Sequence, residues 1–445
     1  MRPVATLTCA GCGAAAGARA LDDAFRCSRA DERPDVDHVV TRTLEASRVR
    51  IDERERDNPF LRYREFLYAY QFAVAHGLRD VDFATIVRRL DDAIARVDGR
   101  GFRITPLTRS APLEARLGLA APAALWIKDE TQNVSGSHKA RHLMGVMLYL
   151  EVLDALGIAR PRRRELAIAS CGNAALAAAV VARAAGYALR VFVPVSADGV
   201  LVDRIRALGA AVETCARSSS TPGDPTYARF RQAVAKGALP FCCQGNENGL
   251  TIDGGETLGL EIAESLASGA GRLVVQVGGG ALAASCLRAF GDMRAIAGVR
   301  MPRFHAVQTA GAHPLTRAFD AVVARLDLDH GRAAGIDAAM KYARTHRSAF
   351  MQPWETEPRS VAHGILDDET YDWAALVEGM LQTSGTPVVV SEAELADANR
   401  VARDTTRIDV DHTGSAGLAG FMQLLTVDPA ARTESAVVIF SGVRR

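Results

Sequence analysis

The sequence predicts an α/β fold built on parallel β-sheet, and three observations lead to it. Short apolar segments alternate with helical patterns from about residue 102 to the C-terminus. Two of these segments run into turns of small residues that a helical pattern follows. Of the 445 residues, 48% are apolar, so the chain can bury a large core in two or three domains. Strand and helix in alternation favour parallel sheets with helices on both faces.

Composition excludes several classes of function. The formal net charge is +1, which gives no reason to expect nucleic acid or an anionic membrane as a partner. The N-terminus lacks the apolar run of a signal peptide, and Arg183 and Arg190 interrupt the longest apolar stretch, at 174–195. Eight cysteines over this length are typical of reduced thiols, so we expect a cytoplasmic protein.

The first hundred residues predict a helical N-terminal extension that begins with cysteines. Cys9 and Cys12 form a CxxC pair, and Cys27 follows at a spacing that would suit a zinc ribbon. A ribbon would close with a second CxxC, which is missing, although Asp31 or His38 could supply a fourth ligand. Three ligands do not close a structural site, so these cysteines are weak metal candidates and we expect a knuckle without metal.

The main body predicts its elements in the following order. Strands are expected at 125–128, 165–170, 189–194, 211–214, 273–277 and 303–308, and helices at 173–185, 202–208, 258–266 and 281–290. The patterns at 387–390, 392–403, 416–425 and 436–440 complete the series.

Lys139 is the candidate nucleophile. The chain contains four lysines, Lys128, Lys139, Lys236 and Lys341, and uses arginine elsewhere. Leu143, Met147 and Leu150 recur at helical spacing, which predicts Lys139 in the first turn of a helix. The amide dipoles there disfavour an ammonium, so the neutral amine that forms a Schiff base with a carbonyl is easier to reach. A solvated lysine at a helix start is the alternative.

Two strand ends carry turns suited to anions. The first is SCGNAA, in which Ser170, Cys171, Gly172 and Asn173 would offer amides to a carboxylate. The second is QVGGGALAAS, where Gly278, Gly279, Gly280 and Ala281 would let the backbone approach a phosphate.

The second turn also satisfies the GxGxxA fingerprint of a dinucleotide site. That fingerprint needs an acidic residue at the end of the next strand, and this strand ends in Gln308 and Thr309. A single phosphate is therefore the favoured ligand. Tight structural packing and a nucleotide-dependent oxidoreductase are the alternatives.

The motifs together resemble a known group. A lysine in SGSHKAR, the loop SCGNAA, the loop VGGGALA and a terminal FSG with Ser441 follow one another as in the pyridoxal-phosphate enzymes of the tryptophan synthase β superfamily, or fold type II. The likeness covers about residues 102–445 and is strongest to threonine synthases and threonine or serine dehydratases. It implies two doubly wound parallel-sheet domains behind the N-terminal extension.

The resemblance also implies roles for individual residues. Lys139 would hold pyridoxal 5'-phosphate as a Schiff base and move the α-proton. His138 could bind the cofactor at its phosphate or simply fill space. Asn173 would bind the cofactor's phenolic oxygen, and Ser170, Cys171, Gly172 and Asn173 the substrate carboxylate. Gly278, Gly279, Gly280 and Ala281 would bind the phosphate, and Ser441 would meet the pyridine nitrogen. A hydroxyl there does not keep that nitrogen protonated, which favours elimination.

The resemblance further implies a domain arrangement and a reaction class. An extension at 1–100 would precede a large cofactor domain, formed by 101–141 and 251–445, and a smaller domain at 142–250. We expect a homodimer that acts on a small amino acid by elimination or replacement at the β or γ carbon. Alternatives are a β-replacement synthase of the cysteine or cysteate synthase kind and a non-catalytic relative.

Three departures from the family pattern stand out. His138 replaces the usual Phe, Ala281 replaces the fourth glycine, and Arg141 with His142 replaces Arg-Gly. The carboxylate-rich stretch 360–373 could recognise a substrate side chain or form a solvated loop.

Overall fold

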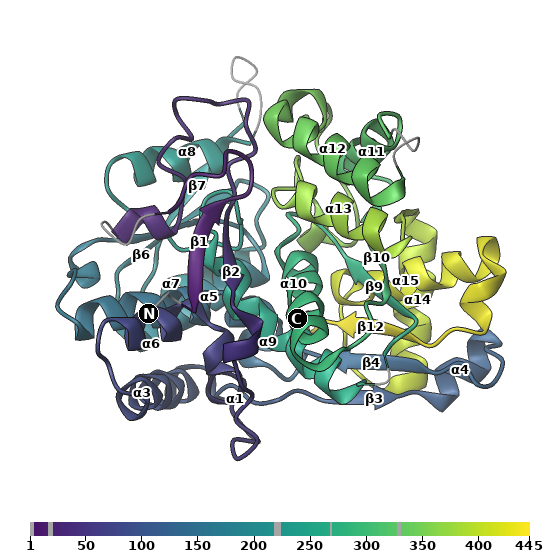
Figure 1. Ribbon diagram of the computed structural model, residues 1–445, viewed down its shortest axis with the longest axis horizontal. Helices are drawn as coiled ribbons and strands as arrows, with labels where there is room; N and C mark the ends of the chain where they lie inside the picture. The colour runs from purple at the N-terminus through teal and green to yellow at the C-terminus, as the bar shows by residue number, and fades with distance from the viewer. Residues whose placement is uncertain (1–3, 17–20, 218–223, 268, 327–330) are drawn as a thin grey trace. The chain divides into compact units, whose positions relative to one another are not determined.

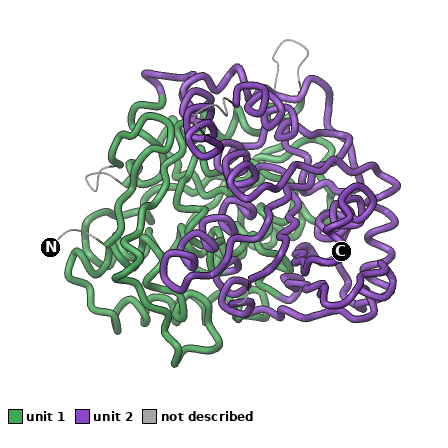
Figure 2. Tube along the Cα trace, turned by 45° about the vertical axis from the view of Figure 1, so that its right-hand side comes forward, with its two compact units in different colours: residues 1–30, 38–104, 133–257 green, residues 31–37, 105–132, 258–445 purple. Residues whose placement is uncertain are grey.

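A computed structural model of the protein describes residues 4–16, 21–217, 224–267, 269–326 and 331–445 (Figure 1). The contacts divide the chain into two compact units (Figure 2). Unit 1 comprises 1–30, 38–104 and 133–257, and unit 2 comprises 31–37, 105–132 and 258–445. In the described part of the chain, no helix has the length and apolar character needed to cross a membrane.

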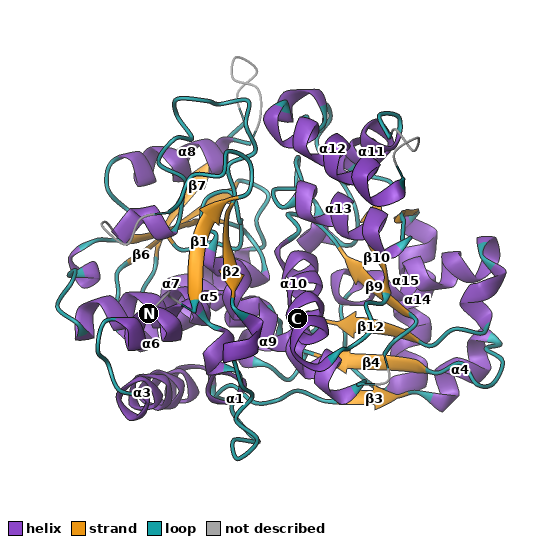
Figure 3. Cartoon of the chain, in the orientation of Figure 1, coloured by secondary structure: helices purple, strands orange, loops and turns teal. Residues whose placement is uncertain are grey.

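Unit 1 contains a four-stranded parallel sheet in the order β7-β6-β5-β8. It also contains an antiparallel ribbon, β1-β2 (Figure 3). The strands are β1 (Ala5–Cys9), β2 (Val40–Leu44), β5 (Leu166–Ala169), β6 (Leu189–Pro194), β7 (Ala211–Cys215) and β8 (Leu239–Pro240). The helices are α1 (Pro59–Arg62), α2 (Tyr68–Ala75), α3 (Asp80–Asp98), α5 (Lys139–Ala155), α6 (Asn173–Ala185), α7 (Gly199–Ala207) and α8 (Pro225–Ala235). Helix α9 (Leu250–Ser265) begins in this unit.

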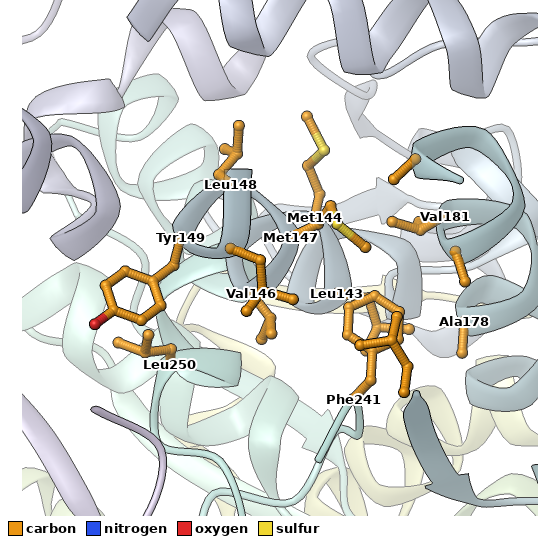
Figure 4. Close-up of a cluster of buried hydrophobic side chains, with 14 of the residues drawn as sticks. Leu143, Met144, Val146, Met147, Leu148, Tyr149, Ala178, Val181, Phe241 and Leu250 are labelled. Atoms are coloured by element: carbon orange, nitrogen blue, oxygen red, sulfur yellow. The ribbon is translucent and has the colours of Figure 1, made fainter. Parts of the chain in front are cut away.

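Helix α5 forms the centre of the unit 1 core. Every residue from Ala140 to Leu153 is buried, and all of them except Arg141, His142 and Glu151 are uncharged and mostly apolar. Leu143, Met144 and Met147 project from it into a cluster that includes Ala178 and Val181 of α6 and Phe241 (Figure 4). Helices α2 and α3 also pack against α5, so the first residue of α5 has a fixed position.

Unit 2 contains a six-stranded sheet in the order β11-β10-β9-β12-β4-β3, parallel except for the edge strand β3. The strands are β3 (Leu107–Arg109), β4 (Leu125–Asp129), β9 (Arg272–Gln276), β10 (Arg303–Thr309), β11 (Pro387–Val390) and β12 (Ala436–Phe440). The helices are α4 (Ala111–Leu117), α10 (Ala281–Ala297), α11 (Pro314–Val323), α12 (Arg332–Thr345), α13 (Trp373–Thr383), α14 (Glu392–Thr406) and α15 (His412–Val427). β9 and β12 are adjacent and fully buried, which explains the apolar sequence of β12 and of residues 273–275 of β9.

The structure confirms the α/β fold with parallel sheets and a helical N-terminal region. The domain boundaries expected from the sequence, near residues 100, 141 and 250, stay predictions. The division found here has its limits at 104, 132 and 257 and assigns residues 38–104 to the same unit as α5 and α6.

Candidate active site

Lys139 is the first residue of α5, as the sequence predicts. The turn before it is fixed by its own hydrogen bonds: the Asn133 side chain accepts from the Val134 amide at 2.8 Å, and the Ser135 amide donates to Asp98 at 2.9 Å. Ser135 has a left-handed φ of 57°. The residues on either side of Lys139 are buried, whereas Lys139 itself is partly exposed. The Lys139 side chain is therefore accessible to solvent, while buried neighbours hold its backbone in place.

Two buried histidines neighbour Lys139. The rings of His138 and His142 lie edge to face, with centroids 5.5 Å apart. Nδ1 of His142 lies 2.7 Å from the Thr251 carbonyl, which only accepts, so Nδ1 carries the proton. Burial, and then the charge of Lys139, lower the pKa of His142 to about 3 and that of His138 well below 6.5. Both rings are therefore neutral at physiological pH and add no positive charge beside Lys139.

The loop of residues 170–173 connects β5 to α6. Gly172 is the N-cap of α6, and its amide donates to Ser170 Oγ at 3.4 Å. Cys171 is exposed, and Ser170, Gly172 and Asn173 are partly exposed. The first-turn amides of a helix have no intrahelical partner and favour an anion, and the first turn of α6 contains no acidic residue. The loop can therefore accept a carboxylate, and its assignment to the substrate carboxylate stays a prediction.

Unit 1 thus holds His138, Lys139 and the loop 170–173 at the N-termini of α5 and α6, two helices that pack against each other. The other expected residues, Gly278 to Ala281 and Ser441, belong to unit 2.

The glycine loop 278–280 connects β9 to α10. Gly280 is the N-cap of α10 with φ +104°, a conformation that favours glycine, and no side chain caps this helix. A Cβ on Gly278 would lie 2.9 Å from the Ile365 Cα and 2.4 Å from Asp367 Oδ2. The amide of Asp372 donates to the Gly279 carbonyl at 3.0 Å. The stretch 360–373 therefore packs on the glycine loop, where the sequence left open a substrate contact or a solvated loop.

Ser441 follows β12 and is 2% exposed. Because β12 and β9 are parallel neighbours, Ser441 and the glycine loop follow strands that end at the same edge of the unit 2 sheet. The amide of Ser441 donates to the Gly414 carbonyl at 3.4 Å. Unit 2 therefore brings together its share of the expected site.

Asp411 supports the Ser441 turn, and the sequence analysis missed it. Its side chain caps α15 by accepting from the Gly414 amide at 2.6 Å, and its own amide donates to the Gly442 carbonyl at 2.8 Å. A Cβ on Gly442 would lie 2.7 Å from both carboxylate oxygens of Asp411. Burial raises the pKa of Asp411 from 3.8 to about 7. Its sequence signal is Asp followed by His-Thr-Gly before an apolar helix, which is an ordinary N-cap pattern.

The residues fit a phosphate better than a dinucleotide. The amides of the first turn of α10 and the glycines before it form an anion site of the kind that binds one phosphate. At the end of β10, the Gln308 side chain is engaged within the fold: it donates to Thr370 Oγ1 at 3.2 Å and accepts from the Leu315 amide at 2.9 Å. No carboxylate replaces it at that described strand end to bind a ribose. The donors present therefore fit pyridoxal phosphate.

The three N-terminal cysteines lie together with His38 in unit 1. Asp31, the other candidate for a fourth ligand, is not part of this group. The expectation of a knuckle without metal stays a prediction at this point.

Comparisons with known proteins agree with these features. The sequence model of the family described as "Pyridoxal-phosphate dependent enzyme" matches residues 100–442. A Rattus norvegicus protein named serine dehydratase-like is 27% identical over 220 residues, which cover 48% of this chain and 59% of the rat protein. The threonine synthase of Methanosarcina acetivorans is 24% identical over 344 residues, which cover 76% of this chain and 74% of the synthase. The match therefore spans less than two thirds of the rat relative.

Solved structures share the fold. The processed form of threonine deaminase isoform 2 from Solanum lycopersicum has a TM-score of 0.58 and 19% identity, and the match covers 82% of this chain and 91% of that one. A maize serine racemase has a TM-score of 0.56 and 18% identity. At this identity the likeness shows the fold alone.

Proposed function

The chain is a member of the family of pyridoxal-phosphate-dependent enzymes, of fold type II, and we propose that it catalyses elimination or replacement at the β or γ carbon of a small amino acid. The relatives named serine dehydratase-like and threonine synthase support this reaction class. The observation that carries the proposal is Lys139: a partly exposed lysine that begins a helix buried from Ala140 to Leu153.

Each residue set has a distinct role in the proposal. Lys139 Nζ would bind the cofactor aldehyde and, once released by the amino acid, take and return the α-proton. The loop 170–173 would bind the substrate carboxylate with the first-turn amides of α6, and Asn173 would also bind the phenolic oxygen of the cofactor. The glycine loop and Ala281 would hold the phosphate. When bound, pyridoxal phosphate supplies an electron sink for the bond that breaks at the α carbon.

The surroundings of Lys139 suit proton transfer. His138 and His142 are neutral, so no cationic histidine opposes the return of the proton to the lysine amine. Ser441 would meet the pyridine nitrogen with a hydroxyl, which does not keep that nitrogen protonated. A weaker electron sink favours prompt loss of a leaving group, and this is the reason that we place elimination first.

The attachment of the cofactor tests the proposal directly. The protein is reduced with borohydride and digested, and the peptides are weighed. We expect a pyridoxyl adduct on the peptide that contains Lys139, and its loss in Lys139→Ala with at least about a thousandfold fall in turnover. Lys236→Ala, at an exposed residue in unit 1, is the matched control and should keep both adduct and turnover. An adduct on another lysine would refute the assignment.

The reaction is tested with phosphohomoserine, serine, threonine and O-acetylserine in turn. A keto acid with ammonia indicates elimination, and a new amino acid in the presence of water or a thiol indicates replacement. Inverted substrate without either product would indicate racemisation and would contradict the proposed reaction. Complete inactivity of unreduced protein that forms the Lys139 adduct when a separate sample is reduced would favour a non-catalytic relative.

We also propose that the enzyme is a homodimer of the cytoplasm. Relatives of this family commonly form oligomers, and none of the eight cysteines, all within the described residues, forms a disulfide, which is consistent with a reducing compartment. Sedimentation equilibrium of the holoenzyme checks the assembly, and a monomer at micromolar concentration would contradict it.

A further inference from the structure

Four side chains near the N-terminus converge in unit 1: Cys9, Cys12, Cys27 and His38, here called the cysteine–histidine cluster. One ligand atom from each residue lies within 4.8 Å of the corresponding atom of every other. All four precede the region that the family model matches, which begins at residue 100. The cluster therefore lies outside the part of the chain that the family model matches.

Local structure explains how a sequence with one CxxC pair gathers four ligands. Cys9 ends β1 opposite Val40 of β2, so His38, just before β2, returns beside it. The chain turns sharply through Gly13 at φ +71°, and the Gly13 amide donates to the Cys9 carbonyl at 2.9 Å, which places Cys12 over Cys9. Cys27 approaches from the segment after the short helix Leu21–Ala24. The fourth ligand is therefore His38, just before the return strand of the ribbon, and not a second cysteine of a CxxC pair at residues 27–30.

The distances match those of a tetrahedral metal site. Zn–S bonds of about 2.3 Å and Zn–N bonds of about 2.0 Å, at tetrahedral angles, separate two sulfurs by about 3.8 Å and a sulfur from a nitrogen by about 3.5 Å. Cys12 Sγ lies 3.6 Å from Cys27 Sγ, and Cys9 Sγ lies 3.4 Å from His38 Nδ1. A disulfide needs its sulfurs about 2.05 Å apart, and all these cysteines are free.

We propose that the cysteine–histidine cluster binds one zinc ion as a structural Cys₃His site. Three thiolates and one imidazole are a ligand set that selects zinc and fills its four positions. Cys9, Cys27 and His38 are 2%, 6% and 8% exposed, so substrate has little access to the metal. The ion therefore has no open position for catalysis.

The ion would fix a loop as well as a ribbon. Cys27 and His38 close the loop that contains residues 31–37, a segment assigned to unit 2. Within that unit, the Asp37 amide donates to the Arg344 carbonyl at 2.8 Å, and Asp37 accepts from Trp373 Nε1 at 3.1 Å. Asp35 accepts from the Ser348 amide at 2.7 Å. A metal bound to Cys27 and His38 would fix the two ends of this loop.

Metal content of the holoenzyme tests the proposal. Purified through a tag that does not use metal, the wild type should contain about one zinc per chain by inductively coupled plasma mass spectrometry. In Cys12→Ala, at the least buried ligand, zinc should fall below about 0.2 per chain, because three ligands do not close the site. The matched control Cys215→Ala removes a buried free thiol of the same unit and should keep about one zinc.

A second measurement does not depend on the folding of a variant. Titration of wild-type thiols with a mercurial should release the zinc in step with the modification of the cluster cysteines. Cobalt incorporated during growth should show the visible bands of a tetrahedral thiolate complex. The proposal would be overturned if folded wild type with reduced thiols contained no zinc, or contained iron in its place. It would also be overturned if Cys12→Ala and Cys215→Ala retained equal amounts of zinc.

Discussion

At the scale of single residues, Asp411 gives unit 2 a pH dependence of known sign. Its pKa is about 7 in the folded chain against 3.8 as its ordinary value, so the folded state holds the proton that the unfolded state releases. The contribution to stability is fully present below pH 4 and is lost as the pH rises to about 7. This residue alone should lower the free energy of unfolding by up to about 1.4 kcal/mol per pH unit in that window.

Asp411→Asn should remove this slope while it keeps an oxygen to cap α15. Unfolding midpoints in urea at several pH values between 4 and 7 measure the effect. Asp428→Asn is the control, because Asp428 caps a short helix in the same unit. Burial raises the pKa of Asp428, but the hydrogen bond from Arg272 and the other favourable interactions lower it more, so the pKa of Asp428 lies below 3.8. Asp428→Asn should therefore leave the dependence of the unfolding free energy on pH unchanged between pH 4 and 7. The same pH dependence in wild type and Asp411→Asn would contradict the role given to Asp411.

The residues that the sequence predicts have roles set by their neighbours in the chain. The residues that were missed have roles set by contacts with residues far away in the sequence. Lys139 and Asn173 are the first residues of their helices. The helical periodicity that follows each residue, and the small residues that precede it, were enough to predict both positions. His142 is neutral because it is buried, and the Thr251 carbonyl fixes its proton on Nδ1. Asp411 matters because Gly442 returns beside it. These two roles depend on contacts between distant parts of the chain, which no local pattern reports.

At the scale of elements, the turn from β9 to α10 should not tolerate a side chain at Gly278. In Gly278→Ala the new Cβ would approach the Ile365 backbone to 2.9 Å, so the loop or the stretch 360–373 must shift. A strain of about 1–3 kcal/mol displaces the amides that bind the phosphate and should weaken pyridoxal-phosphate affinity about 10- to 100-fold. Equilibrium dialysis against the cofactor measures this change.

Gly291→Ala is the matched control, because Gly291 lies in the same helix α10 and its added Cβ would have no neighbour within 4 Å. This variant should keep the cofactor affinity within about twofold, and it should stabilise the helix by up to about 1 kcal/mol. Equal affinities in the two alanine variants would show that the packing at Gly278 does not shape the phosphate loop.

Element prediction failed where glycine or weak patterning misled it. Helix α9 begins at Leu250, earlier than the expected 258. Gly254 lies inside it, and a Cβ at Gly254 would lie 2.1 Å from the Arg141 carbonyl oxygen. Glycine is therefore required by close packing and does not end the helix. The sequence analysis placed no element from 309 to 386, yet α11, α12 and α13 form there. Leu315, Ala318 and Val322 of α11 do carry an amphipathic pattern that could have identified it.

At the scale of the whole molecule, the N-terminal ribbon is an integral part of unit 1. Arg42 of β2 pairs with Asp253 at 3.0 Å and with Glu256 at 2.6 Å, across more than two hundred residues of sequence. The three side chains are at most 5% exposed. Val40 of the same strand packs closely on Gly249: a Cβ on Gly249 would lie 2.1 Å from the Val40 carbonyl oxygen. Sequence alone described this region as an extension, since partners so far apart leave no local signal.

The buried ion pairs make the ribbon testable as a structural part. Arg42→Met keeps the length of the side chain but leaves two carboxylates buried without their cation, which costs about 3–5 kcal/mol. We expect a large fall in the thermal unfolding midpoint. Arg48→Met is the control: its pair with Glu45 is 33% and 50% exposed, and loss of an exposed pair costs about 0.5 kcal/mol or less. Similar midpoints for the two variants would mean that the ribbon is a dispensable extension. A selective loss in Arg42→Met would mean that residues 38–104 must be kept in any active fragment.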